Sequence, residues 1–541
     1  MPADLNALRR DAARWLTDLE HAATALATRV AQRGAAAPDR VQVECFDLAW
    51  AAADRRAAQA GLAADGPLAG ALGVLFATEA GEGALARLDA VARACGEAAD
   101  EEALAALRAA PAWRALLRAV AVPDALDRVG AAVIERGDDG DDLPLDEATQ
   151  MARDAFARLA AEVVAPLAGA IHRDDLTVPD AILTPMRDMG AFGLAIPDDF
   201  GGVAVDEQTA AVTMVAVTEV LSEASLAAAG SLITRPEILS RALLAGGTEA
   251  QKHDWLPRIA AGRPLCAIAI TEPDYGSDVA ALQLRATRVP GGWRLDGAKT
   301  WCTFAGKAEL LMVVARTGGE GHRGLSLMMV EKPSDDGHAF AHVQPGGGRM
   351  EGRAIATIGY RGMHSFDLSF DAWFVADDRV IGEEGGVGRG FYLTMAGMTG
   401  GRMQTAARAS GVMRAAVRAA IAHARDRRVF GAALGDYPLT RAKIARMAAR
   451  AMACRRLAFE VARGRDPAAA SFEAALAKLI ACRSAEAVTR EALQIHGGLG
   501  YAEETAVSRL FVDARVLSIF EGAEETLALK VVGRGLLERA V

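Results

Sequence analysis

The sequence predicts an α+β fold in which helical segments precede and follow a single β domain. Apolar residues form 52% of the 541 residues and aromatic residues only 5%, and alanine is abundant, which favours helices packed on helices. Short alternating or continuous apolar runs separated by glycine-rich turns gather at 265–380, and they are typical of strands. A chain of this length is too long for one core, so several domains are expected.

Residues 1–138 predict an all-helical N-terminal extension. Apolar residues in its first segment recur at helical spacing, at Leu5, Leu8, Ala12, Trp15, Leu19, Leu26 and Val30. The stretch ERGDDGDDLPLD at 135–146 combines glycine, proline and acids, and it predicts a linker. No group of residues suited to catalysis precedes this linker, so the extension is expected to be a packing domain.

Three further domains are predicted after the linker. Residues 142–264 are helical, with a break at FGLAIPDDFGGVAVD. Residues 265–380 form the β domain, where runs such as ELLMVVART and HSFDLSF predict strands. Residues 385–541 return to the helical period. A cleft where the β domain meets the helices is a common place for a cofactor.

Charge, cysteine usage and hydropathy limit the possible partners. The formal net charge of −10 argues against a nucleic-acid partner or an anionic membrane. The six cysteines contain no CxxC pair, which is typical of reduced thiols in a cytoplasm. The first residues carry charges where a signal peptide would be apolar, and no apolar run of membrane-spanning length is predicted. No metal site is predicted.

Two loops of the β domain carry candidate binding residues. AIAITEPDYGSDVAAL at 267–282 leaves a strand and enters a polar turn, which could also be an ordinary strand-end loop. DGAKTWCTFAGKAELLMVVART at 296–317 places Trp301 and Thr303 at a strand end. An indole beside hydroxyl groups suits a flat heteroaromatic ring, whereas the alternative is a tryptophan buried in the core.

Two stretches of the C-terminal helices combine arginine or glycine with a helix end. ARDRRVFG at 424–431 places Arg427 and Arg428 where they could bind phosphate, or could simply complement the helix dipole. QIHGGLGY at 494–501 ends a helix at Gly497 and Gly498. These glycines could form a C-cap, or could let the backbone approach a ligand closely.

The stretch VLSIFEGAEETLAL at 516–529 places one carboxylate, Glu521, between Phe520 and Gly522. Glu521 could be a residue at the start of a helix, or a base among apolar groups. Glu524 and Glu525 are expected to favour the N-terminus of the helix that follows.

Taken in order, these five stretches resemble the acyl-CoA dehydrogenase family over residues 145–541. The resemblance implies a helical domain, a central β domain and a C-terminal four-helix bundle, to which the extension is added. It also implies FAD as the cofactor. The residues implied to contact FAD are Ile270, Thr271, Ser277, Trp301, Thr303, Arg427, Phe430, Gln494, Gly497 and Gly498.

The resemblance makes Glu521 the base that removes the α-proton of an acyl-CoA thioester. That proton is weakly acidic, so burial among apolar groups such as Phe520 must increase the proton affinity of the carboxylate. Hydride from the β-carbon is implied to pass to the flavin. The developing enolate oxygen needs donors, and the implied ones are the N–H of Glu521 and a flavin hydroxyl.

The implied substrate residues are Ser277, Arg402, Gly522 and Arg235. The extension and the stretch GRMEGRAIATIGYRGMHSF are similar to the branch of the family that oxidises (2S)-methylsuccinyl-CoA to mesaconyl-CoA in the ethylmalonyl-CoA pathway. The free carboxylate of such a substrate needs a cation, and Arg235 or Arg402 could serve. Arg235 could equally lie at the surface or pack between domains.

Three alternatives remain open within the family. The chain could be a dehydrogenase of another short acyl-CoA, an acyl-CoA oxidase, or a non-dehydrogenase that binds nucleic acid. The acidic charge and the presence of Glu521 argue against the last alternative. Family membership implies electron-transfer flavoprotein as the electron acceptor, and a homodimer or homotetramer in which Arg427 reaches the FAD of another subunit.

Overall fold

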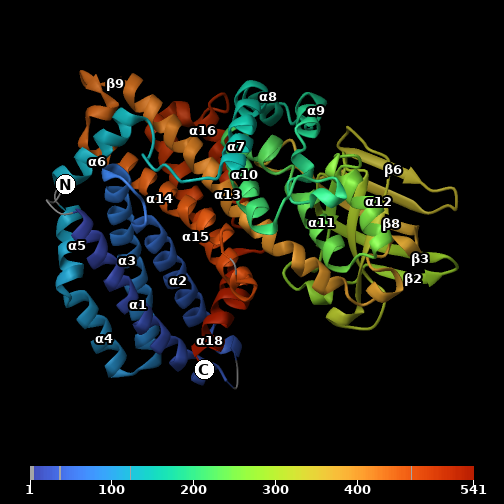
Figure 1. Ribbon diagram of the computed structural model, residues 1–541, viewed down its shortest axis with the longest axis horizontal. Helices are drawn as coiled ribbons and strands as arrows, with labels where there is room; N and C mark the ends of the chain where they lie inside the picture. The colour runs from blue at the N-terminus through green and yellow to red at the C-terminus, as the bar shows by residue number, and fades with distance from the viewer. Residues whose placement is uncertain (1–4, 36–37, 122, 465, 541) are drawn as a thin grey trace. The chain divides into compact units, whose positions relative to one another are not determined.

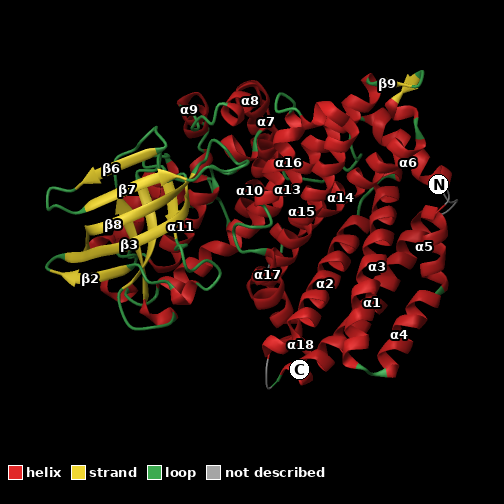
Figure 2. Cartoon of the chain, turned by 180° about the vertical axis from the view of Figure 1, so that it is seen from behind, coloured by secondary structure: helices red, strands yellow, loops and turns green. Residues whose placement is uncertain are grey.

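The computed structural model describes residues 5–35, 38–121, 123–464 and 466–540, and these form two compact units. The first contains residues 1–146 and 405–541, and the second contains residues 147–404. Helices, then a β sheet, then helices follow one another along the chain (Figures 1 and 2). The predicted α+β class is therefore confirmed. The boundary between the units falls inside one long helix, α13 (Gly390–Asp426).

The first unit joins the N-terminal extension to the C-terminal helices. The extension contains α1 (Leu5–Gly34), α2 (Gln42–Leu62), α3 (Pro67–Cys95), α4 (Ala98–Ala109), α5 (Pro111–Ala121) and α6 (Pro123–Arg136). The C-terminal part contains the end of α13, the strands β9 (Arg428–Val429) and β10 (Ala432–Ala433), α14 (Pro438–Ala462), α15 (Pro467–His496), α16 (Ala506–Val516), α17 (Glu524–Thr526) and α18 (Arg534–Ala540). A π-helical segment, Leu527–Gly533, joins α17 to α18.

Helices α2 and α3 pack along α14, and α2 also contacts α15 (Figure 1). Alanines dominate the buried faces, which lets the helix axes approach closely. Arg56 of α2 pairs with Glu460 of α14 and Glu473 of α15, at 3.1 and 3.0 Å. Within the extension, Trp15 and Trp113 stack with ring centroids 4.1 Å apart. The extension therefore shares one core with the C-terminal helices.

The acidic linker is anchored in this core by a buried ion pair. Asp141 is 7% exposed and accepts hydrogen bonds from Arg456 of α14, with Nε 2.8 Å and Nη2 2.6 Å from Oδ1. Asp139 is also buried, and its Oδ2 lies 3.8 Å from Arg414 of α13. Burial raises the pKa of the Asp139 carboxyl, and Arg414 opposes that effect. These contacts attach the linker to α13 and α14.

The second unit begins with helices. These are α7 (Glu147–Leu159), α8 (Ala165–Arg173), α9 (Asp180–Asp188), α10 (Glu207–Ala224), α11 (Thr234–Gly246) and α12 (Glu249–Ala260). A π-helical turn, Ala160–Val164, joins α7 to α8, and another, Leu226–Gly230, follows α10. Helix α12 starts with a capping box made by Thr248 and Gln251, which satisfies two backbone donors at that end.

The sheet of the second unit has eight strands in the order β1-β4-β2-β3-β8-β7-β6, with β5 paired to β4 (Figure 2). They are β1 (Cys266–Ala269), β2 (Arg285–Val289), β3 (Gly292–Thr303), β4 (Leu310–Arg316), β5 (Leu325–Glu331), β6 (Ala339–Val343), β7 (Arg349–Ala354) and β8 (Ser365–Ala376). Neighbours are antiparallel except where β4 meets β1 and β2. Strand β4 separates two cores, because Leu311 and Val313 face the strands while Leu310 and Met312 face α11 and α12.

The expectation that no apolar run reaches membrane-spanning length was wrong. Two helical stretches, Pro67–Cys95 and Glu147–Arg173, are long and apolar enough by length and composition. In the first, 78% of the apolar window is buried in the protein, and in the second 39% is buried. Alanine, glycine and leucine give a core helix the same mean hydropathy as a membrane span. By length and composition alone, the two stretches are therefore weak evidence of membrane insertion.

Removing one partner of the linker ion pair should destabilise the first unit. Asp141→Ala leaves the Arg456 guanidinium buried without its carboxylate, which should cost about 3–5 kcal/mol of unfolding free energy. The matched control is Asp142→Ala, whose side chain is 95% exposed and should change stability by less than about 0.5 kcal/mol. Urea denaturation followed by circular dichroism measures both, and equal midpoints for the two variants would contradict the anchoring role.

Candidate active site

The predicted site residues fall on both units, and each set is described within its own unit. The first unit carries Arg427, Phe430, Gln494, Gly497, Gly498, Glu521 and Gly522. The second unit carries Arg235, Ile270, Thr271, Ser277, Trp301, Thr303 and Arg402.

Glu521 lies in a tight turn between α16 and α17. Its φ is +54°, which is unusual for a residue with a side chain, and Gly522 follows with φ +97°. Residues with a side chain rarely adopt a φ of +97°, so the turn favours glycine at position 522, where a Cβ atom would also lie 2.9 Å from Cδ2 of Leu527. Helix α17 starts at Glu524 with Ala523 as its N-cap, so Glu521 is not a helix-start residue. Its side chain is half-buried.

Lys478 of α15 stabilises this turn through hydrogen bonds to its backbone. Its side chain is 1% exposed, and Nζ donates to the carbonyl oxygen of Phe520 at 2.8 Å and to that of Gly522. The carbonyl of Phe520 and the N–H of Glu521 belong to one planar peptide, so fixing the oxygen also fixes the direction of the N–H. Within the described residues this N–H donates no backbone hydrogen bond. It is therefore oriented and available to an acceptor.

Further charged side chains fix the two ends of the turn. Glu486 of α15 accepts a hydrogen bond from Ser518, and Arg483 of the same helix pairs with Glu524. The guanidinium carbon of Arg483 also lies 3.5 Å from the ring centroid of Trp50 in the extension. Sequence reasoning missed Lys478 and Arg483, although charges within the apolar stretch AALAKLIACRSAEAV were a signal. It also gave Glu524 only a helix-dipole role.

The two predicted phosphate-binding stretches meet at one end of the first unit. The hairpin β9–β10 turns at Phe430 and Gly431, whose φ values of +49° and +90° are those of a tight two-residue turn. This turn leaves Phe430 fully exposed, and Arg427 is also exposed. His423 at the end of α13 stacks on His496 at the end of α15, with centroids 4.3 Å apart. Burial lowers the pKa of His423, and the positive charges of His496 and Arg427 act in the same direction.

The same stack places Gln494, Gly497 and Gly498 close to the hairpin. All three are exposed at the end of α15. Gly497 adopts φ +60° and ψ −136°, and no atom lies within 4 Å of a Cβ built on either glycine. The exposed guanidinium of Arg427, the Phe430 ring and this open backbone fit the phosphates and apolar parts of a flavin nucleotide.

In the second unit a buried ion pair fastens the loop at 270–272 to β3. Lys299 is 1% exposed, and its Nζ lies 2.7 Å from the carbonyl oxygen of Ile270 and 2.8 Å from Oε1 of Glu272. The Thr300 N–H donates to the carbonyl oxygen of Thr271 at 2.9 Å. Burial lowers the pKa of Lys299, and Glu272 opposes that shift. The structure thus brings Ile270 and Thr271 beside the strand that carries Trp301, while Ser277 is exposed further along the loop.

Trp301 is presented by a β-bulge. The register of β3 against β8 shifts between Lys299 and Cys302, and Trp301 adopts φ +56°. The indole is 54% exposed, so the alternative of a core tryptophan is wrong. The Thr303 hydroxyl lies 2.9 Å from that of Ser365. A flat exposed indole next to a hydroxyl pair fits a flavin ring with hydrogen-bonding edges.

The two candidate cations for a substrate carboxylate lie on helices in contact. Arg235 of α11 is 5% exposed and donates to the carbonyl oxygen of Ser231 at 2.9 Å, so the surface alternative for it is wrong. Arg402 of α13 is 9% exposed. Thr234, next to Arg235, donates to Gln404 at 2.9 Å and so joins the two helices.

Comparison with known proteins identifies the family of the chain. Models of the N-terminal, middle and C-terminal domains of acyl-CoA dehydrogenases match residues 146–263, 267–373 and 388–537. The chain is 41% identical over 398 residues to (2S)-methylsuccinyl-CoA dehydrogenase of Cereibacter sphaeroides, covering 73% of this chain and 70% of the relative.

Solved structures give the same result. The fold is similar to that of butyryl-CoA dehydrogenase from Megasphaera elsdenii, with a TM-score of 0.66 and 27% identity over 73% of this chain and all of the other. It is also similar to glutaryl-CoA dehydrogenase in complex with glutaryl-CoA, with a TM-score of 0.64 and 27% identity over 71% of this chain and 94% of the other.

Replacing Lys478 should loosen the turn that carries Glu521. Lys478→Met removes two charge-assisted hydrogen bonds worth about 1.5–3 kcal/mol each, so amide hydrogen exchange over 518–524 should accelerate at least about tenfold. Lys530→Met is the matched control, because the side chain of Lys530 is 69% exposed. Exchange measured by mass spectrometry tests this prediction. Equal protection of 518–524 in the wild-type protein and in Lys478→Met would show that the lysine does not hold the turn.

Proposed function

Because the chain belongs to the acyl-CoA dehydrogenase family, we propose that it removes the α- and β-hydrogens of a short branched acyl-CoA thioester, (2S)-methylsuccinyl-CoA, to give mesaconyl-CoA. Family membership makes the protein an FAD-dependent oxidoreductase. The choice of substrate is supported by the 41% identity with a methylsuccinyl-CoA dehydrogenase. The observation that carries the proposal is the half-buried carboxylate of Glu521 in a turn held by Lys478.

In this mechanism Glu521 takes the α-proton of the thioester. Its left-handed backbone directs the carboxylate out of the turn, while Lys478 fixes the peptide plane behind it. The N–H of Glu521 donates no backbone hydrogen bond among the described residues, so it would be free to donate to the thioester oxygen as that oxygen gains negative charge. Because one amide links the carbonyl held by Lys478 to the donor, Lys478 acts as a positioning residue.

FAD is the cofactor that the exposed groups of each unit would hold. We assign the flavin ring to Ile270, Thr271, Ser277, Trp301 and Thr303, and the diphosphate end to Arg427, Phe430, Gln494, Gly497 and Gly498. When bound, FAD accepts the hydride from the β-carbon of the substrate. The exposed hairpin at Phe430 suits contact with a second subunit, so we propose a homodimer or homotetramer in which Arg427 reaches the FAD of another copy.

The thioester would be bound by Ser277 and Arg402, with Gly522 beside the reacting carbons. The free carboxylate of methylsuccinyl-CoA requires a cation in a desolvated site, and the buried Arg235 and Arg402 are the candidates. We propose electron-transfer flavoprotein as the electron acceptor, and the cytoplasm as the compartment.

Glu521→Gln should separate chemistry from cofactor binding. The amide cannot accept the proton, so exchange of the substrate α-proton with solvent should fall at least about a hundredfold, while FAD remains bound. Proton exchange is followed by NMR in deuterated buffer, and FAD content by absorbance. Glu525→Gln, an exposed acid four residues further on, is the control and should keep wild-type exchange. Normal exchange in Glu521→Gln would refute the base assignment.

An anaerobic absorbance spectrum tests the substrate. Adding (2S)-methylsuccinyl-CoA to the purified holoenzyme should bleach the flavin band, because two electrons leave the substrate. Butyryl-CoA lacks the methyl branch and the free carboxylate, and glutaryl-CoA lacks the branch and has a longer chain, so both should bleach it far less. Bleaching by a control alone would replace the proposed substrate but keep dehydrogenation. A flavin band that none of the three thioesters bleaches would overturn the proposed activity.

A further inference from the structure

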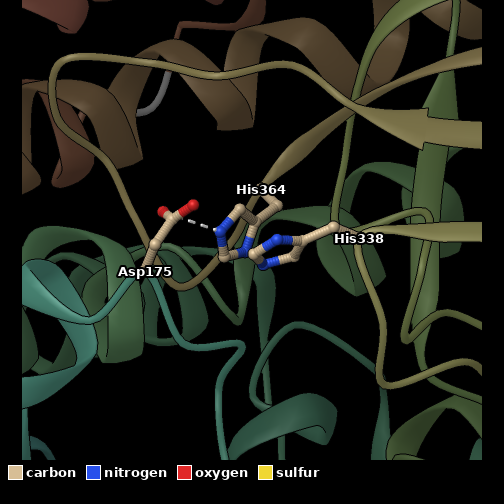
Figure 3. A group of neighbouring side chains, drawn as sticks. All are labelled: Asp175, His338 and His364. Carbon is tan, nitrogen blue, oxygen red and sulfur yellow. Dashed lines mark hydrogen bonds and ion pairs between the residues drawn. The ribbon is translucent and has the colours of Figure 1, made fainter.

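Three side chains outside the candidate active site converge in the second unit (Figure 3). Asp175 lies between α8 and α9, His338 directly before β6, and His364 directly before β8. One possible ligand atom from each side chain lies within 4.8 Å of the other two. The three residues are far apart in sequence, so the fold alone gathers them.

The centre of this cluster is the buried imidazole of His364, which is 6% exposed. Its Nε2 lies 3.1 Å from Oδ1 of Asp175. The ring of His338 lies on another side, with centroids 4.4 Å apart and planes inclined by 44° (Figure 3). Nε2 is therefore the nitrogen through which His364 could share an ion with Asp175.

Backbone strain coincides with the cluster. Asp175 has φ +52° and His364 has φ +34°, and neither is a glycine. The surrounding structure holds both, because the N–H of Phe304 donates to the carbonyl oxygen of His364 at 2.8 Å and that of Leu176 donates to Ile171 at 3.0 Å. Strain of this kind costs about 1–3 kcal/mol per residue and gathers at ligand sites.

We propose that Asp175, His338 and His364 bind one divalent transition-metal ion of the zinc class. Two imidazole nitrogens and one carboxylate oxygen suit Zn²⁺, Co²⁺ or Ni²⁺, whereas Ca²⁺ and Mg²⁺ need mostly oxygen ligands. Metal–ligand bonds of about 2.0–2.1 Å put the ligand atoms of a tetrahedral ion about 3.4 Å apart. The ligand atoms lie within 4.8 Å of one another, so they must approach slightly to bind one ion. His338 is exposed, and its side chain is free to make that movement.

Arg361 helps to select the class of ion. Its Nε lies 3.6 Å from Oδ1 of Asp175, and its guanidinium also donates to the carbonyl oxygens of His172 and Thr357 at 3.1 and 3.3 Å. This positive charge orients the carboxylate but reduces its attraction for a cation. The imidazoles must therefore supply most of the affinity, which favours zinc-class ions over Ca²⁺ and Mg²⁺.

A bound ion would join three segments: the loop at 174–176, the start of β6 and the loop that ends at His364. The last of these carries the carbonyl that accepts from Phe304, directly after Thr303. By holding His364 in place, the ion would also restrain the loop that begins after Thr303. The site needs neither the proposed substrate nor the proposed base, so its test is independent of the dehydrogenase activity.

Metal titration of the full-length holoenzyme tests the site. After treatment with a chelator and its removal, isothermal titration with ZnCl₂ should give one ion per chain, and CoCl₂ should give visible absorption bands. His338→Ala should weaken Zn²⁺ binding at least about tenfold, as even the loss of an outer-sphere partner costs about 10–100-fold. Asp175→Asn should also weaken it.

His342→Ala is the matched control. His342 lies on β6, the strand that His338 precedes, and pairs with Asp335 at 2.7 Å, but no second histidine joins that pair within the described residues. Its replacement should leave Zn²⁺ affinity unchanged. Because His364 is buried, circular dichroism must show that His364→Ala folds, and the exposed His338 keeps the test valid if it does not. Absence of stoichiometric Zn²⁺ binding, equal affinity in His338→Ala, or a preference for Ca²⁺ would overturn the proposal.

Discussion

The strained turn at Glu521 depends on one buried ammonium group. A non-glycine residue at φ +54° is held only where its surroundings leave no relaxed alternative. Lys478 provides that constraint, since it donates to the carbonyls on both sides of Glu521. Burying a lysine is costly unless its charge is satisfied, and the two carbonyls offset that cost. The lysine and the turn are therefore mutually dependent.

Two other candidate stretches also contain a non-glycine residue at positive φ that its surroundings hold in place. Trp301 at φ +56° sits in a bulge next to Lys299, whose buried ammonium binds the carbonyl of Ile270 and the carboxylate of Glu272. Phe430 at φ +49° occupies a hairpin turn whose geometry demands a positive φ. In each case the residue with a left-handed backbone carries a candidate functional side chain. A buried cation or a pair of strands next to that residue stabilises its backbone conformation.

Arg483 connects the N-terminal extension to the turn that contains Glu521. That side chain stacks on Trp50 of α2 and pairs with Glu524, three residues after Glu521. Helix α2 also contacts the π-helical segment Leu527–Gly533. The helix that begins beyond Glu521 is thus packed between α15 and the extension. This gives the extension a structural role at the candidate active site, in addition to forming a common core with the C-terminal helices.

The order of helical and β segments could be predicted because burial imposes its period on the sequence: β4 runs apolar since both its faces are covered, whereas β8 alternates. Motifs also singled out Glu521, Trp301 and Arg427, and their roles stay predictions. What could not be predicted are the partners of charged residues. Lys478 resembles any lysine on a helix, and Asp141 resembles any acid in a linker, because their partners lie 42 and 315 residues away in sequence. Asp175, His338 and His364 carry no local pattern for the same reason.

The letters F-E-G can now be explained by geometry. The guanidinium carbon of Arg408 lies over the ring of Phe520, 4.7 Å from the ring centroid, and this contact fixes the residue before Glu521. Glu521 then reverses the chain with a left-handed φ, and Gly522 continues the reversal at φ +97° where Leu527 leaves no space for a Cβ. An alanine at position 522 would be strained at this φ, whatever the space around it. Phe520, Glu521 and Gly522 therefore act as one unit, in which the outer two residues determine where the carboxylate points.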